Sequence, residues 1–376
     1  MGFELNKSYS GFRLTQKKEI DELKSLGLFF EHEATKAELM VLENDDDNKV
    51  FSATFRTPPE DDTGIAHILE HSVLCGSKNF PVKEPFVELM KGSLQTFLNA
   101  MTFPDKTMYP VASRNQKDFF NLMHVYLDAV FYPNISEETF KQEGWHYELN
   151  SPKDKIVYKG VVLNEMKGEF SNPESSIDRQ LAHSLFPSTA YGFESGGDPK
   201  KIPELTYQKF KEFHRKHYHP SNSRLFFYGD GDTQSYLDFL QEKYLQDFGS
   251  IDINTSIAYQ RAFRKPKRKP MSYPVSSDES LDKKTYVLLG YKLDKAVNHE
   301  HCLGFSILSH LLLGSSASPL RKALITSELG SEVIGGGFDD NRADTIFAVG
   351  LKGTEPEHEN KILTLIDSTL CELADN

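Results

Sequence analysis

The sequence feature that most constrains this chain is a short helix-forming stretch at residues 64–77, which reads GIAHILEHSVLCGS. It contains His67 and His71, four residues apart, with Glu70 between them. On an α-helix, side chains three or four positions apart share one face, with Cβ atoms about 5–6 Å apart. The two imidazoles can therefore hold one metal ion, and Glu70 projects from the same face. Catalytic zinc needs three protein ligands, an open position and a base, so this stretch lacks only the third ligand.

Two downstream glutamates are candidates for that third ligand. Glu165 lies in the apolar helical stretch VVLNEMKG, where a buried carboxylate needs a partner. Glu169 follows four residues later on the same helical face and competes with it. Spacing alone leaves both glutamates open. It also leaves open that the helix is an ordinary surface helix, because short motifs of this kind arise by chance.

Composition narrows the partners that the chain can have. With 43 Lys and Arg against 55 Asp and Glu, the net charge is −12, which disfavours nucleic acid and suits basic ligands. No apolar run approaches the roughly 20 residues of a membrane span, and the start resembles neither a secretory signal nor a transit peptide. We therefore expect no nucleic-acid and no membrane partner. The 3 cysteines are far apart and indicate reduced thiols rather than a disulfide framework.

Hydrophobic patterning predicts an α+β fold in two units. We expect a zinc-binding domain over residues 1–249, a polar linker over 250–283, and a second, truncated α+β domain over 284–376. In the first domain, alternating patterns predict strands between 26 and 57, with the acidic run at 43–48 as a hairpin turn. A polar helix or loop is expected over 16–27, and a helix over 116–131.

Several separated motifs give the chain a family resemblance. They are HILEHSVLCGS, FLNAMT followed by DKT and Tyr109, EGW at 143–145, and NEMKG at 164–168. In this combination the chain resembles the N-terminal half of the pitrilysin or insulinase metallopeptidases, the inverzincins, and most of all their presequence protease, falcilysin-like branch. The resemblance implies one Zn²⁺ held by His67, His71 and Glu165, with Glu70 as the general base.

The resemblance also implies an architecture and an activity. Members of the family are clamshells of two similar halves, and each half has two related α+β domains with mostly antiparallel sheets packed against helices. They enclose a chamber that admits unfolded peptides. We therefore expect a zinc endopeptidase that degrades short or unfolded peptides, basic ones included, and whose partner is the C-terminal half of the same protein. The present chain alone should be weakly active or inactive.

Two alternative functions remain open at this point. One is a processing peptidase that clips targeting sequences, and the other is a non-catalytic scaffold member of the same fold. The expected compartment is the bacterial cytoplasm, or an organellar matrix if a transit peptide has been removed.

The resemblance suggests two substrate-binding places. The strand at 94–102 is similar to the family's edge strand beside the zinc, which makes Asn99 and Ala100 candidates for contact with an extended peptide. Gly335 and Gly336 lie in a strand pattern that resembles the glycine strand holding the substrate N-terminus in relatives, and glycine permits close backbone approach.

Overall fold

The structure is a computed structural model that describes residues 2–83 and 85–375. The chain forms two compact units, Met1–Met166 with Glu194–Ser256, and Lys167–Phe193 with Ile257–Asn376. Each combines helices with a mostly antiparallel sheet, so the predicted α+β class is confirmed. The predicted domains run continuously along the sequence, whereas each unit here is built from two separate segments. Residues 167–193 join the second unit because Leu181 packs against Gly290 of its sheet.

The first unit is built on a nine-stranded sheet in the order β1-β2-β3-β4-β11-β5-β8-β6, with β7 also paired to β8. Neighbouring strands are antiparallel except β4 and β11, which are parallel. The strands are β1 (Ser8–Tyr9), β2 (Phe12–Ile20), β3 (Ser25–His32), β4 (Glu38–Glu43), β5 (Lys49–Arg56), β6 (Gln95–Leu98), β7 (Met101–Thr102), β8 (Lys106–Ser113) and β11 (Ser223–Gly229).

Two local predictions in this sheet are wrong. Residues 12–20 form strand β2 instead of a polar helix or loop beginning at 16, because their backbone pairs along its length with β3. Residues 43–48 do not close a hairpin, because β11, from the far end of the unit, lies between β4 and β5. Leu225 and Phe227 of β11 are buried there, which gives this distant strand a place inside the sheet.

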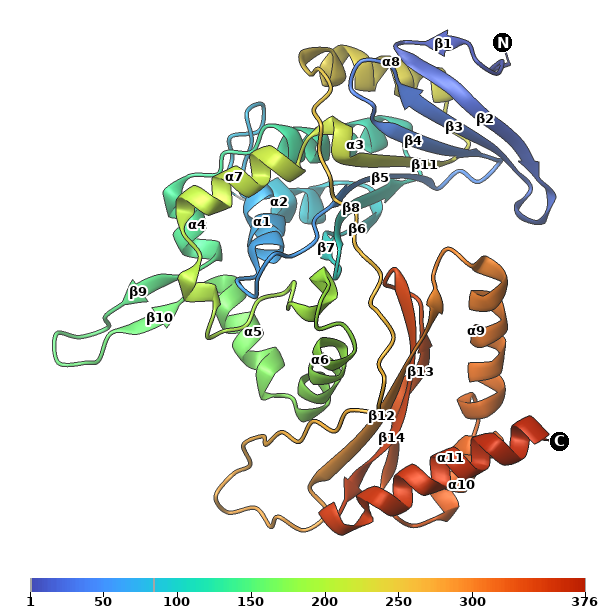
Figure 1. The fold of residues 1–376 in the computed structure, drawn as a ribbon. Coiled ribbons are helices and arrows are strands. Elements are labelled where there is room, and N and C mark those ends of the chain that lie inside the picture. The colour runs from blue at the N-terminus through green and yellow to red at the C-terminus, as the bar shows by residue number, and fades with distance from the viewer. Residues whose placement is uncertain (1, 84, 376) are drawn as a thin grey trace. The chain divides into compact units, whose positions relative to one another are not determined.

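The helices of this unit lie beside the sheet, and α3 packs against β5 and β8 (Figure 1). The predicted helix over 116–131 is confirmed as α3, which Asn115 caps by accepting a hydrogen bond from the Asp118 backbone N–H at 3.0 Å. The helices of this unit are α1 (Ile65–Val73), α2 (Pro85–Gly92), α3 (Gln116–Phe131), α4 (Glu137–Glu143), α7 (Tyr207–His217) and α8 (Thr233–Lys243). A hairpin of β9 (His146–Glu148) and β10 (Val157–Lys159) leads to α5 (Val161–Ser171), whose last turns belong to the second unit.

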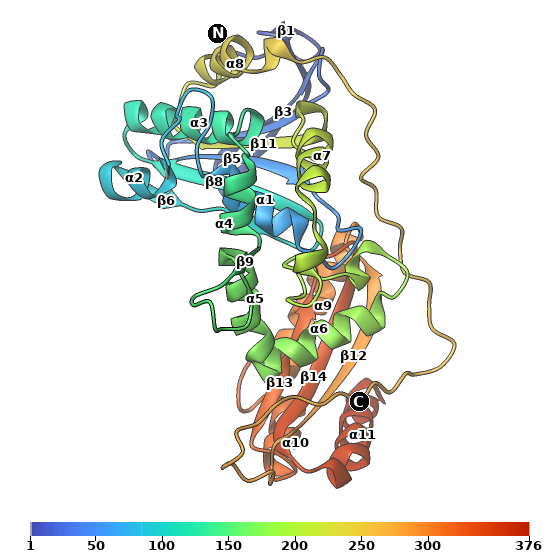
Figure 2. The same cartoon turned by 90° about the vertical axis from the view of Figure 1, so that its left-hand side faces the viewer.

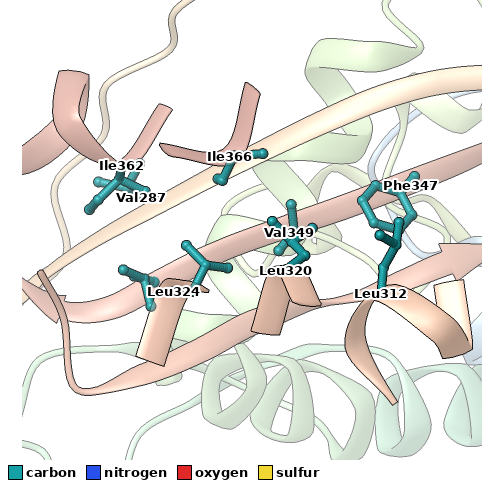
Figure 3. Close-up of a cluster of buried hydrophobic side chains, with 9 residues drawn as sticks. Val287, Leu312, Leu320, Leu324, Phe347, Val349, Ile362 and Ile366 are labelled. Carbon is teal, nitrogen blue, oxygen red and sulfur yellow. The ribbon is translucent and has the colours of Figure 1, made fainter. Parts of the chain in front are cut away.

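The second unit has a three-stranded antiparallel sheet in the order β12-β14-β13. Helices α9, α10 and α11 cover one face and α6 the other (Figures 1 and 2). Alternate residues of β14 explain this, since Phe347 and Val349 face α9–α11 (Figure 3) while Ile346 faces the α6 side. The elements are β12 (Thr285–Lys295), β13 (Glu332–Asp339), β14 (Asp344–Thr354), α6 (Pro173–Leu185), α9 (His299–Leu313), α10 (Pro319–Thr326) and α11 (Glu359–Asp375).

The remaining chain is irregular or forms short turns. Residues 249–284, which include the predicted linker, contain no helix or strand, and Gln260 within them donates its backbone N–H to Asp344 at 2.7 Å. Among the described residues, no helix has both the length and the apolar character to span a bilayer. The 3₁₀ turns lie at Asp21–Leu23, Ala190–Gly192, Ile202–Glu204, Pro220–Asn222, Leu245–Asp247 and Pro356–His358.

Candidate metal centre

Helix α1 carries the first part of the site, and its start explains how the helix is held. Gly64 precedes the helix with φ +67°, and a Cβ there would lie 2.6 Å from the carbonyl oxygen of Gly196. Only glycine lets the segment at 196–197 approach this closely. Eight of the nine residues of α1 are buried, so its side chains have fixed surroundings.

Both histidines of α1 are oriented through their Nδ1 atoms. Nδ1 of His67 lies 3.0 Å from the carbonyl oxygen of Gly196, and Nδ1 of His71 lies 3.3 Å from Oε2 of Glu143. Because both partners are acceptors, each Nδ1 carries a proton and donates it. The Nε2 lone pair of each neutral ring is then available for a metal ion.

Glu165 of α5 meets these two Nε2 atoms. Its Oε2 lies 3.7 Å from Nε2 of His67 and 3.6 Å from Nε2 of His71. The three ligand atoms lie within 4.8 Å of one another, and no other such group occurs among the described residues. Ligand atoms about 2.0–2.1 Å from a tetrahedral zinc stand about 3.3 Å apart, so the spacing and the His₂Glu donor set fit Zn²⁺.

The competing glutamate is not part of this group. Glu169 lies one turn further along α5, and its Oε2 accepts a hydrogen bond from the Ser175 hydroxyl at 3.4 Å. The structure therefore brings Glu165, and not Glu169, to the two histidines.

Glu143 is a member of the site whose role sequence reasoning missed. In the sequence it stands out only as part of the EGW motif. In the structure it is buried on α4 behind His71, and it also accepts a hydrogen bond from the Gln142 amide at 2.9 Å. Burial by itself raises the pKa of Glu143, but the hydrogen bonds from His71 and Gln142 outweigh it and lower the pKa overall. A carboxylate behind a ligating histidine fixes its tautomer and ring orientation. The sequence signal that could have found it is its place three residues after Phe140, on the buried face of α4.

The contact between Glu143 and His71 raises the pKa of His71, whereas it lowers the pKa of Glu143. Burial tends to lower the pKa of His71, but the hydrogen bond to Glu143 and the charges of Glu70 and Glu165 raise it overall. The electrostatic surroundings of His71 are therefore strongly negative, which also favours a cation at this place.

Glu70 lies on the same helix but outside the three-ligand group. Glu70 is 9 % exposed, and its carboxylate accepts a hydrogen bond from the Thr102 hydroxyl at 2.6 Å. Thr102 belongs to β7, so the edge of the sheet fixes this carboxylate. The pKa of Tyr126 is raised, first by burial and then by the negative charge of Glu70. Its hydroxyl therefore stays protonated and can donate a hydrogen bond.

The candidate substrate residues Asn99 and Ala100 lie between β6 and β7 at the sheet edge. The Asn99 backbone is held on both sides, since its N–H donates to Pro110 at 3.2 Å and its carbonyl accepts from the Tyr126 hydroxyl at 3.2 Å. The Asn99 side chain is exposed, and its oxygen accepts the Ala100 N–H at 3.0 Å.

Gly335 and Gly336 lie in the second unit, at a register shift in β13. Their φ angles are +105° and +66°, and a Cβ on Gly335 would lie 2.7 Å from the Ala348 backbone. Gly335 therefore needs glycine, and the left-handed backbone at Gly336 favours it. They line a groove of about 470 Å³ between α6 and β13, together with the charged side chains of Glu174, Asp178, Asp339 and Arg342.

Comparison with known proteins gives the class. The pattern described as Insulinase (Peptidase family M16) matches residues 55–169, and that described as Peptidase M16 inactive domain matches residues 204–376. Fold and matches together define a protein of the metallopeptidase class. More specifically, the chain belongs to peptidase family M16, which confirms the predicted resemblance.

Individual relatives agree with this assignment. Protein HypA of Clostridium perfringens is 49% identical over 378 residues, covering 100% of this chain and 39% of its own length. Presequence protease 1, chloroplastic/mitochondrial, of Arabidopsis thaliana is 51% identical, covering 97% of this chain and 34% of its own. The chain thus spans little more than a third of these relatives.

Solved structures support the fold. Pitrilysin superposes with a TM-score of 0.61 at 16% identity, covering 97% of this chain and 38% of its own. A putative M16-like peptidase from Alicyclobacillus acidocaldarius superposes with a TM-score of 0.66 at 16% identity, covering 96% of this chain and 81% of its own.

Proposed function

We propose that this chain is the metal-binding part of a zinc endopeptidase that degrades short or unfolded peptides. The observation that carries the proposal is the convergence of His67, His71 and Glu165, with Glu70 one residue from a ligand on the same helix. Relatives named presequence proteases support a peptidase of this kind.

Each residue has a distinct role in this proposal. His67 and His71, through Nε2, and Glu165 would hold one Zn²⁺. When bound, zinc supplies Lewis acidity that makes water acidic enough to react near neutral pH. Glu70 takes the proton of the attacking water and delivers it to the departing amine nitrogen. Thr102 holds the Glu70 carboxylate in place through its 2.6 Å hydrogen bond.

The edge formed by β6 and β7 is the proposed place for the substrate backbone. Among the described strands, β6 pairs only with β8, so its other edge is available for an added strand. Main-chain hydrogen bonds along the open edge of β6 would bind an extended peptide with little dependence on its sequence. Asn99, through its exposed side chain, and Ala100 would contact the peptide where this edge ends. The exposed side chains of Leu94 and Phe97 offer apolar contacts beside them.

A second edge, β13, is the proposed anchor for another part of the peptide. Like β6, it is the last strand of its sheet among the described residues, and Gly335 and Gly336 let a chain approach its backbone. Beside it, Glu174 pairs with Lys352 and Asp339 with Arg342, so Asp178 is the acidic side chain that would suit an N-terminal amine or a basic side chain. Together with the net charge of −12, this favours basic, presequence-like peptides.

The activity of the whole protein needs more than this chain. We propose that a further half, which accounts for the greater length of the relatives, closes a chamber around the peptide. Relatives named chloroplastic/mitochondrial favour an organellar matrix, and the clostridial relative a bacterial cell interior.

The replacement Glu70→Gln in the full-length protein tests the proposal. We expect zinc content to stay at the wild-type level and hydrolysis of a quenched fluorescent peptide to fall at least about 100-fold, since general acid–base catalysis contributes that much. Glu169→Gln, on α5 but outside the ligand group, is the matched control and should retain activity. Cleavage by Glu70→Gln at the wild-type rate would refute the role of Glu70. A wild-type protein that binds peptide without cleaving it would favour a scaffold.

A further inference from the structure

A second groove lies on the α9 side of β13, opposite the acidic groove on the α6 side. It has a volume of about 380 Å³ and is enclosed by α9, α10 and β13. Its ionisable side chains are His310 of α9 and Arg321 of α10, and none of its lining residues in the described part of the chain is acidic. The two grooves meet along β13 at Val333, Ile334 and Gly336. Strand β13 therefore separates an acidic groove from a basic one.

Arg321 has hydrogen-bond donors that the protein does not use. It is half-buried, and its Nη1 donates to the carbonyl oxygen of Leu313 at 3.4 Å. It forms no ion pair with any described residue, although carboxylates are in excess in this chain of net charge −12. A guanidinium has five N–H donors in a planar fork that matches a carboxylate. A carboxylate that enters the groove would therefore meet an unpaired cation.

The basic groove occupies the place in the second unit that the candidate metal centre occupies in the first. The sheet order β12-β14-β13 matches β5-β8-β6, and α9 follows β12 as α1 follows β5. The two helices also share a sequence pattern, since residues 68–74 read ILEHSVL and residues 307–313 read ILSHLLL. In this alignment three residues that line the groove take the places of His67, Glu70 and His71, namely Ser306, Ser309 and His310.

The replacements change the chemistry from a metal site to an anion site. The position of Glu70 keeps its contact with the sheet edge, because the Ser309 hydroxyl accepts the Phe338 backbone N–H of β13 at 3.0 Å. Serines replace one imidazole and one carboxylate, so the set that could hold a metal ion is lost. The remaining imidazole, the Ser306 hydroxyl and the guanidinium all have N–H or O–H groups to donate. Such a group of donors suits a negatively charged ligand.

A peptide strand added to the free edge of β13 would reach both grooves. Successive side chains of a strand point to opposite faces of a sheet. A peptide residue whose side chain enters the acidic groove at Asp178 therefore directs the side chain of its neighbour toward Arg321 and His310.

We propose that Arg321 and His310 form a subsite that binds the carboxylate of an acidic side chain in a peptide held along β13. This acidic residue directly follows the basic residue that Asp178 holds. The guanidinium of Arg321 pairs with the carboxylate, and His310 and Ser306 donate further hydrogen bonds to it. The inference rests on the proposed function, because it needs a peptide along β13, but it needs neither zinc nor cleavage.

Two peptides that differ in one residue test this subsite. They begin Lys-Glu and Lys-Gln, contain no other acidic residue, and carry a fluorophore at an amidated C-terminus. Their binding to the full-length protein is measured by fluorescence anisotropy, with EDTA present so that metal-dependent cleavage does not occur. We expect the Lys-Glu peptide to bind at least about fivefold more tightly, because a charge-assisted hydrogen bond is about twice as strong as one to a neutral amide.

Substitutions on α10 show whether this preference arises in the groove. Arg321→Gln should bind both peptides equally and keep the wild-type affinity for Lys-Gln, which also shows that the variant is folded. Arg321→Lys, which keeps the charge, should regain part of the preference. Lys322→Gln, which removes the same charge from an exposed position on the same helix, is the control and should keep the whole preference.

Three results would overturn the subsite and leave the proposed function intact. They are equal binding of the two peptides by the wild-type protein, a preference that survives in Arg321→Gln, and an equal loss of preference in Arg321→Gln and Lys322→Gln. Binding of neither peptide would instead overturn the proposed β13 anchor together with the subsite.

Discussion

Glu143 shows how a residue without metal contact can determine a metal centre. It accepts the Nδ1 proton of His71 and so holds the ring with Nε2 toward Glu165. We predict that Glu143→Gln, which keeps an acceptor but loses the charge, weakens zinc affinity about 10–100-fold. Competition with a chromogenic chelator measures this affinity. Glu138→Gln, an exposed position on the same helix, is the control, and equal affinities in both variants would contradict the role of Glu143.

Thr102 offers a second test at the residue scale, because it gives Glu70 its hydrogen bond. We predict that Thr102→Val lowers kcat of the full-length protein by about 10- to 160-fold, which corresponds to about 1.5–3 kcal/mol for a hydrogen bond to a charged group. KM and zinc content should stay unchanged, and Thr102→Ser, which restores the hydroxyl, should recover most of kcat. If the Val and Ser variants have the same kcat, the hydroxyl does not position Glu70.

Helix α7 carries a histidine that links the stability of the first unit to pH. His217 is 2 % exposed; its Nδ1 donates to the Arg56 carbonyl at 3.2 Å, while Nε2 is buried without a hydrogen-bond partner. Burial, followed by the charge of Lys216, lowers the pKa of His217 to about 4. The folded protein thus favours the neutral ring.

The lowered pKa of His217 gives a prediction for unfolding in acid. The neutral ring of His217 contributes fully to the free energy of unfolding above about pH 6.5, the pKa of the residue in the unfolded chain. This contribution is lost as the pH falls toward 4, by up to about 3 kcal/mol. His217→Asn, whose amide can still donate to Arg56, should flatten the decline in unfolding free energy between pH 6.5 and 4. Urea titrations at several pH values measure it, with the exposed His299→Asn as control. An unchanged decline in His217→Asn would count against the prediction.

Helices and strands could be predicted where the residues that define them, such as caps, apolar faces and prolines, lie within the element itself. The helix over 116–131 has its own cap and an apolar face, and Pro173 marks the break between α5 and α6. The prediction for residues 16–20 is wrong because this part of β2 is mostly exposed and has no alternating burial. Its pairing with β3 holds it in the sheet. The place of β11 between β4 and β5 depends on partners more than 160 residues apart, which no local pattern contains.

The candidate site also combines residues that are close in the sequence with residues that only the fold brings together. His67, Glu70 and His71 could be found because one helical turn brings them together. The choice of Glu165 over Glu169 depends on how α5 meets α1, which spacing along the sequence does not contain. Glu143 comes from a separate helix, and its role became visible only through its distance to His71.

At the scale of the whole molecule, the two units share one topology, since the order β12-β14-β13 in the second sheet matches β5-β8-β6 in the first. The helices that follow β5 and β12 differ in the residues they carry. In the first unit the helix after β5 carries the two candidate ligand histidines. Helix α9, which follows β12 in the second unit, has Gly304 and Phe305 where the same helical spacing from His301 would require Glu and His. Both units keep an edge strand, β6 and β13, that can accept an added peptide strand. The repeat therefore pairs one candidate metal centre with two candidate peptide-binding edges.

The central claim is that His67, His71 and Glu165 hold one zinc ion, and the most direct test is the zinc content of the purified chain by mass spectrometry after dialysis against trace zinc. We predict one zinc per wild-type chain, near zero for Glu165→Gln, and one again for Glu169→Gln. A wild-type content near zero that added zinc does not restore, or a Glu165→Gln variant that keeps its zinc, would contradict the claim.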